Sequence, residues 1–133
     1  MSKYIEKVEN LTLPAIPLRG LVIFPGVPTS FEINSKLSVK ALKQSALYGG
    51  NVFLSAVKNP EKKEIPPVMF PMGIVAKVKQ SLKLPDGNYR VLIEGISRAE
   101  LVSAQYSQEY LLANVLKKTI HLEDNNSIKA QAL

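Results

Sequence analysis

Ser55 and Lys58 come closest to a catalytic motif by residue type and spacing. They fit S-x-x-K, the spacing at which a lysine can assist a serine nucleophile in some acyl-enzymes. That chemistry needs both side chains on one face of a helix, one turn apart. Residues 51–57 instead form an apolar run typical of a buried strand, where positions 55 and 58 point to opposite faces. We therefore predict a strand end followed by a surface lysine.

Other groups with chemical potential form no constellation. His121 is the single histidine and the chain has no cysteine, so the sequence offers neither a disulfide framework nor a thiolate metal site. We interpret His121 as a solvated side chain. The sequence contains no G-x-x-x-x-G-K-[ST] loop for a nucleotide. We therefore expect no catalytic residue, no metal and no cofactor in this chain.

The segment Ile65–Met72 is the main binding candidate. It is apolar throughout and contains three prolines, so it suits neither a regular helix nor a central strand. Flexible methionine side chains adapt to varied apolar partners, as a surface that binds many unfolded proteins must. Packing in the core is the competing interpretation. The candidate contact residues are Pro67, Met69, Phe70 and Met72, with Phe24 and Phe31 as further candidates.

A long β-hairpin over residues 73–95 is the strongest signal for the elements that position these residues. Apolar and polar side chains alternate with a period of two, which places one set on a buried face and the other in water. Pro85 and Gly87 supply the turn, through a fixed φ and a tolerance of positive φ. The predicted buried set is Ile74, Ala76, Val78, Leu82 and Leu84.

One helix is predicted from Lys36 to Tyr48. Asn34 or Ser35 can cap its start, and Gly49 with Gly50 can end it. Its apolar face is Leu37, Ala41, Leu42, Ala46 and Leu47.

The remaining apolar runs predict a mainly β fold. Residues 11–19 are interrupted by Pro14 and Pro17, which predicts an edge strand or an extended segment. One helix with six or seven strands favours a small pseudo-barrel with the helix plugging one end, because closure protects strand edges. The other predicted strands are 21–24, 27–33, 51–57, 96–104 and 110–120, the last with Leu111, Ala113 and Val115 inward.

The chain carries a formal net charge of +6, spread along its length. A solvated surface of mixed charge explains such a distribution. The alternative is a nucleic-acid interface built on Lys77, Lys79 and Lys83, although that stretch lacks the aromatic residues on which single-stranded bases stack. No apolar run is long enough to span a membrane and the N-terminus lacks a signal-peptide core, so we expect a cytoplasmic protein that does not bind membranes.

Three groups of residues together resemble the N-terminal, substrate-binding domain of the Lon family of ATP-dependent serine proteases. The resemblance covers about residues 11–120, with the groups in the family's order and spacing. They are Leu13-Pro14 to Pro17-Leu18-Arg19 with Phe24-Pro25-Gly26, Val75-Ala76 with Leu84-Pro85-Asp86-Gly87, and the run 91–99 that includes Gly95 and Arg98.

This resemblance implies a fold related to PUA-type barrels that captures unfolded, misfolded or regulatory proteins. It also implies a longer hexameric parent with a helical region, an ATPase that uses ATP and magnesium, and a protease with a Ser–Lys dyad. We expect a polar lead-in at 1–10, the domain at 11–120, and the start of a truncated helical region at 121–133. The alternatives are a PUA-like nucleic-acid-binding module and an architectural domain that supports hexamer assembly.

Two arginines of these motifs have structural interpretations. Arg19 has five N–H donors that can anchor a neighbouring loop through backbone carbonyl groups. Arg98 stands four residues after Glu94, a spacing that does not pair side chains along a strand, so we expect a structural ion pair or hydrogen bond for these residues rather than a functional one.

Overall fold

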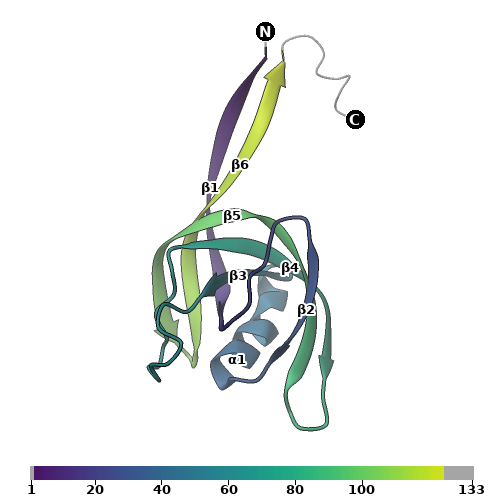
Figure 1. Ribbon diagram of the computed structural model, residues 1–133, viewed down its shortest axis with the longest axis vertical. Coiled ribbons are helices and arrows are strands. Elements are labelled where there is room, and N and C mark those ends of the chain that lie inside the picture. The colour runs from purple at the N-terminus through teal and green to yellow at the C-terminus, as the bar shows by residue number, and fades with distance from the viewer. Residues whose placement is uncertain (1, 125–133) are drawn as a thin grey trace.

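The computed structural model describes residues 2–124, and the side chains of residues 6–119 (Figure 1). Six strands, one α-helix and one 3-10 helix make up this part of the chain. They are β1 (Ser2–Leu18), β2 (Pro28–Ile33), α1 (Lys36–Gln44), η1 (Ser45–Tyr48), β3 (Asn51–Ala56), β4 (Met72–Lys83), β5 (Tyr89–Ser107) and β6 (Tyr110–Asp124).

The sheet closes on itself, which confirms the predicted barrel with one helix. The strand order is β2-β5-β4-β3-β1-β6, and β6 also pairs with β5. The first part of β5, residues 89–94, pairs with β2, whereas residues 99–107 pair with β6. Five strands therefore form the ring, β2 extends one side of it, and most strand edges are paired.

Two apolar cores lie on the two faces of the central strands. The first, which we call the ring core, fills the ring and includes Phe53 from β3, Val75 from β4 and Ala113 from β6. The second, which we call the helix-side core, lies on the opposite face. There Leu54 and Ile74 pack with Ala41 and Leu42 of α1. Neighbouring residues of a strand point to opposite faces, so β3 is buried on both sides, as its apolar sequence predicts.

The prolines of β1 lie in an extended segment, as predicted, but its strand stands between β3 and β6 and not at an edge of the sheet. β1 pairs with β6 as far as Ala15 and with β3 from Ala15 onward. Pro14 therefore has only β6 beside it and Pro17 has only β3. Each proline can turn the side without an N–H away from its single neighbour, which is how a strand tolerates proline.

Three local predictions differ from the structure. Residues 21–24 form no strand, and residues 96–104 continue β5 rather than forming a separate strand. The helix starts at Lys36, where the Ser35 hydroxyl accepts a hydrogen bond from the Ser38 amide, as predicted. Its last turn tightens into η1, which rotates Ala46 and Leu47 into solvent.

The hairpin of β4 and β5 is confirmed, but its alternation ends early. Ile74 and Ala76 are buried as predicted, whereas Leu82 is exposed. β3 pairs with β4 only over residues 74–77, so residues 80–83 have β5 alone beside them. The register also shifts between Val78 and Gln80, so that Leu82 pairs with Arg90 and faces away from the side on which Val78 pairs with Ile93.

The ends of the described chain are strands. Residues 2–10, expected to be a polar lead-in, belong to β1 and pair with residues 116–124 of β6, and the two strands project together from the barrel (Figure 1). Residues 121–124, expected to begin a truncated helical region, are part of β6. The rest of that region, 125–133, and the side chain of His121 lie outside the described residues. The proposed domain boundaries stay predictions.

Candidate functional site

The segment between β1 and β2 is held against β5 at Gly95. The Gly26 amide donates a hydrogen bond to the Gly95 carbonyl at 2.8 Å, and Pro25 forms an isolated bridge with Gly95. A Cβ atom at position 95 would lie 2.5 Å from the carbonyl oxygen of Phe24. Only glycine permits the two backbones to approach so closely. This contact therefore sets the position of the Phe24 backbone, and with it the position of the Phe24 side chain.

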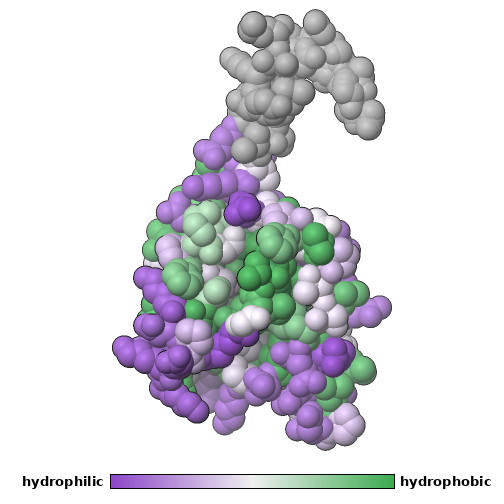
Figure 2. Space-filling view, in the orientation of Figure 1, coloured by the Kyte–Doolittle hydropathy of each residue, from purple (hydrophilic) through white to green (hydrophobic). Residues whose placement is uncertain are grey.

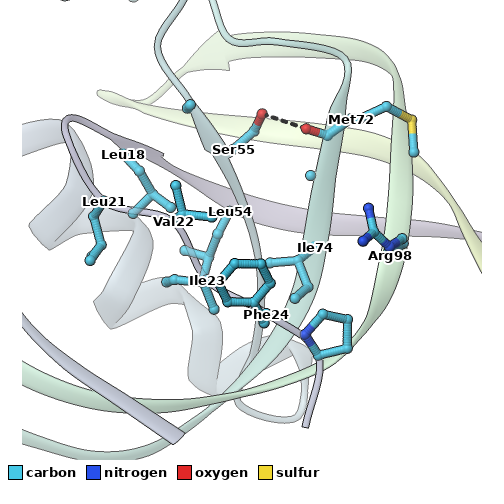
Figure 3. Close-up of a pocket in the computed structure, with 13 residues that line it drawn as sticks. Leu18, Leu21, Val22, Ile23, Phe24, Leu54, Ser55, Met72, Ile74 and Arg98 are labelled. Atoms are coloured by element: carbon cyan, nitrogen blue, oxygen red, sulfur yellow. Dashed lines mark hydrogen bonds between the residues drawn. The ribbon is translucent and has the colours of Figure 1, made fainter. Parts of the chain in front are cut away.

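Ser55 holds the segment that leads into β4. Its hydroxyl donates to the Phe70 carbonyl at 2.6 Å and also lies 3.1 Å from the Met72 carbonyl (Figure 3). The Phe70 amide in turn donates to the Ala56 carbonyl. Ser55 is buried while Lys58 is exposed, so the S-x-x-K pair is a strand residue that secures a loop and a surface lysine, as predicted.

These two attachments bring Phe24 and Met72 to one apolar pocket of about 190 Å³. Leu18, Leu54 and Ile74 form its buried floor, and the labelled side chains of Figure 3 surround it. Phe24 is 56% exposed and Met72 is 48% exposed. The pocket therefore presents large apolar side chains to solvent above a buried apolar base.

Val22 adds to this apolar surface and was missed by the sequence analysis. It lines the pocket and is 69% exposed, whereas the sequence placed it in a buried strand. The flanking Gly20 and Pro25 are loop signals that could have identified it. In Figure 2, hydrophobic residues gather in the middle of the face over which the 19–27 segment runs in Figure 1. We call the pocket and the three exposed side chains Val22, Phe24 and Met72 the apolar site.

The other predicted contact residues lie elsewhere. Met69 is buried in the ring core, so the expectation that it contacts a partner gives way to the alternative of core packing. Phe70 is exposed but does not line the pocket, and Pro67 lines a different groove. Phe31 is half-buried against the helix-side core. Of the six candidates, the structure unites two, Phe24 and Met72.

The two motif arginines have different surroundings. Arg19 donates a hydrogen bond to the Pro60 carbonyl at 2.7 Å, a loop contact of the kind expected. Arg98 lines the apolar pocket. Glu94 pairs with Lys79 at 3.4 Å, and no ion pair of Arg98 occurs among residues 6–119. The spacing of Glu94 and Arg98 did not predict a pair between them, and Glu94 instead has a surface ion pair with Lys79. The sole charged side chain of the pocket is the guanidinium of Arg98.

The hairpin turn follows its sequence signals. The Asp86 carboxylate accepts a hydrogen bond from the Asn88 amide at 3.0 Å, and Gly87 has φ +91°. The proposed stripe of Lys77, Lys79 and Lys83 is interrupted because Lys79 pairs with Glu94. Binding of a phosphate backbone is favoured by an uninterrupted row of cations. Among the described residues of β4, Lys77, Lys79 and Lys83 do not form such a row.

Other chemistry is sparse in the described chain. Burial raises the pKa of Tyr110, and a hydrogen bond with Tyr48 raises this pKa further. No group of three histidine, cysteine, aspartate or glutamate residues could hold a metal ion within residues 6–119. Neither helix of the described chain is long and apolar enough to cross a membrane.

Comparisons with known proteins give one consistent family. The profile described as "ATP-dependent protease La (LON) substrate-binding domain" matches residues 12–133. The Lon protease of Clostridioides difficile (strain 630) is 39% identical over 126 residues, and Lon protease 1 of Bacillus subtilis (strain 168) is 32% identical over 127 residues. The matches cover 94% and 92% of this chain but 16% of each relative. The chain thus spans a small part of the relatives' length.

Solved structures share the fold. The N-terminal domain of the Mycobacterium avium complex Lon protease has a TM-score of 0.60 at 14% identity, over 92% of this chain and 61% of that chain. A Lon N-terminal domain protein from Xanthomonas campestris has a TM-score of 0.57 at 14% identity, over 88% of this chain and 62% of that chain.

Proposed function

The chain belongs to the family of Lon substrate-binding domains, and from that premise we propose that its apolar site captures exposed hydrophobic segments of unfolded proteins. The observation that carries the proposal is the meeting of Phe24 and Met72, both half-exposed, at the rim of one apolar pocket. Folded proteins bury most such side chains, whereas unfolded clients expose them.

The shape of the apolar site suits varied clients. Its floor of buried aliphatic residues, Leu18, Leu54 and Ile74, is part of the core that packs against α1, while the unbranched Met72 side chain can adjust to different partners. Arg98 stands beside this apolar surface and can donate to a client carbonyl or carboxylate. Recognition of this kind selects hydrophobic character near a hydrogen-bond acceptor rather than one defined sequence.

We place this capture in a longer polypeptide whose other modules use ATP and magnesium and cleave the client with a Ser–Lys dyad, as in the Lon proteases it resembles. A single small apolar site binds a flexible client weakly, because ordering the client costs entropy. Several copies in a hexamer raise the effective concentration, so that weak sites together hold a client. This chain would then bind clients without performing chemistry.

An NMR titration of the isotope-labelled 133-residue chain tests the proposal. The ligand is a permanently unfolded polypeptide, and its folded counterpart is the control. We expect shifts at Val22, Phe24 and Met72 with the unfolded form only. The double variant Phe24→Ser with Met72→Ser should bind about tenfold more weakly.

A matched double variant separates this site from general surface hydrophobicity. Leu47 and Leu82 are 77% and 62% exposed and do not line the pocket, so Leu47→Ser with Leu82→Ser removes two apolar side chains elsewhere. Client affinity should stay unchanged in this control. Equal losses in both double variants, or no shifts at millimolar client, would contradict capture at the apolar site and favour an architectural role.

A further inference from the structure

A second, larger groove lies between the end of β1, the start of α1, the loop before β4 and the turn that joins β5 to β6. It encloses about 560 Å³. No residue lines both this groove and the apolar pocket: Leu18 lines the pocket, whereas its neighbours Pro17 and Arg19 line the groove. We call this second feature the basic groove.

Positive charge dominates the basic groove. Four cationic side chains line it against two carboxylates, and none of the six belongs to an ion pair among residues 6–119. An anionic partner therefore meets an excess of cations, none of which is held in an ion pair with these carboxylates. The six residues are Arg19, Lys36, Lys62, Lys63, Glu64 and Glu109.

The loop that carries two of these cations is anchored. Arg19 donates to the Pro60 carbonyl at 2.7 Å, which ties the loop to the end of β1. The Lys62 amide donates to the Asn59 carbonyl and closes a turn. In Figure 2 hydrophilic residues cover the lower left of the molecule, where this loop lies in Figure 1. The cations are thus presented on a fixed backbone.

The basic groove also has an apolar wall. Ile65 is 78% exposed and Tyr106 is 42% exposed, and Pro67 lines the groove with them. A partner that only carried charge would leave these side chains in water. A partner with an apolar side chain next to its negative groups would cover them.

We propose that the basic groove binds an extended, acidic polypeptide segment that carries an apolar side chain beside its carboxylates. The carboxylates pair with Lys62, Lys63 and Lys36, and the apolar side chain covers Ile65. Glu64 and Glu109 disfavour a continuous phosphate backbone, and one aromatic residue gives little stacking surface, so the groove suits a peptide better than a nucleic acid. This second surface is separate from client capture at the apolar site.

Fluorescence anisotropy on the 133-residue chain tests the inference. The probe is a short labelled peptide in which glutamate and aspartate flank leucines, and the control peptide has glutamine and asparagine in their place. We expect the acidic peptide to bind more tightly than the control peptide, whose leucines can engage only the apolar site, and we expect this difference to shrink as salt rises. Lys62→Glu with Lys63→Glu should weaken binding about tenfold, and Ile65→Ser should weaken it several-fold.

Lys77→Glu with Lys83→Glu is the matched control, because it changes the net charge equally on exposed residues outside the groove. This control should bind the acidic peptide as the parent chain does, and Phe24→Ser with Met72→Ser should keep the preference for the acidic peptide over the control peptide. Equal losses in the two charge-reversed variants, equal binding of both peptides, or binding of an oligouridylate in place of the acidic peptide would each overturn the inference.

Discussion

The α-carbon of Gly95 faces the carbonyl oxygen of Phe24 so closely that a Cβ atom there would lie 2.5 Å from it. Gly95→Ala should therefore displace the 24–26 segment and lower the free energy of unfolding by about 1–3 kcal/mol. Client affinity should fall as well, because Phe24 leaves its place at the pocket. Urea denaturation and the amide signals of Phe24 and Gly26 measure the two effects.

Gly87→Ala is the control for this prediction. A Cβ at Gly87 meets no atom within 4 Å, although its φ of +91° strains any other residue. Gly87→Ala should cost stability while client affinity stays unchanged. An unshifted Phe24 amide in Gly95→Ala would show that the close approach does not position this segment.

Ser55 and Ser97 form a matched pair of buried hydroxyl groups, 3% and 6% exposed. The Ser55 hydroxyl donates to the Phe70 carbonyl and also lies near the Met72 carbonyl, whereas the Ser97 hydroxyl has no partner among the described residues. Ser55→Ala should cost about 1–2 kcal/mol of unfolding free energy, and Ser97→Ala should be neutral or stabilising. Urea midpoints of the two variants make the comparison, and equal costs would show that the Ser55 bonds are not responsible.

Met69 and Met72 are three residues apart and have opposite environments. Met69 is 6% exposed in the ring core, and Met72 is 48% exposed at the apolar site. Met69→Ala should destabilise the chain by about 2–5 kcal/mol, whereas Met72→Ala should cost less than about 1 kcal/mol. Thermal and urea unfolding check this order, which would be reversed if Met72 were the core residue.

Tyr110 gives the stability a dependence on alkaline pH. Its pKa is raised above the model-compound value of 10.0 by burial and by Tyr48. As pH rises, the unfolded chain therefore loses the Tyr110 proton before the folded chain does. The contribution of this proton to the free energy of unfolding is complete below pH 10 and is lost as pH rises through the higher pKa of the folded chain. Tyr110→Phe should flatten this part of the pH profile, read from urea midpoints on either side of pH 10, and an unchanged slope would exclude Tyr110 as its source.

The sequence predicts structural elements correctly where they depend on contacts between residues that are close in the chain. Ser35 caps a helix because its hydroxyl reaches an amide three residues away. The turn at Asp86 and Gly87 likewise depends on φ preferences and on a carboxylate near its own backbone. These signals need no distant partner, and the strand ends of the hairpin follow from them.

Burial depends on which strand lies alongside, and the sequence could not show this. Leu82 has the spacing of a core residue, yet the register shift after Val78 pairs it with Arg90 and leaves it exposed. Pro14 and Pro17 have the character of edge residues because proline lacks a donor, yet β1 changes partner between them. Both outcomes depend on how the strands pair in the sheet.

The sequence by itself determined the family, the mainly β class with one helix, and the pool of apolar residues available for binding. Only the tertiary structure decided that Phe24 and Met72 share a pocket while Met69 is buried. Two contacts between distant segments, at Gly95 and at Ser55, place these side chains. Closing such long loops depends on the whole sheet, because no local preference of the residues at either end specifies where the other end will lie.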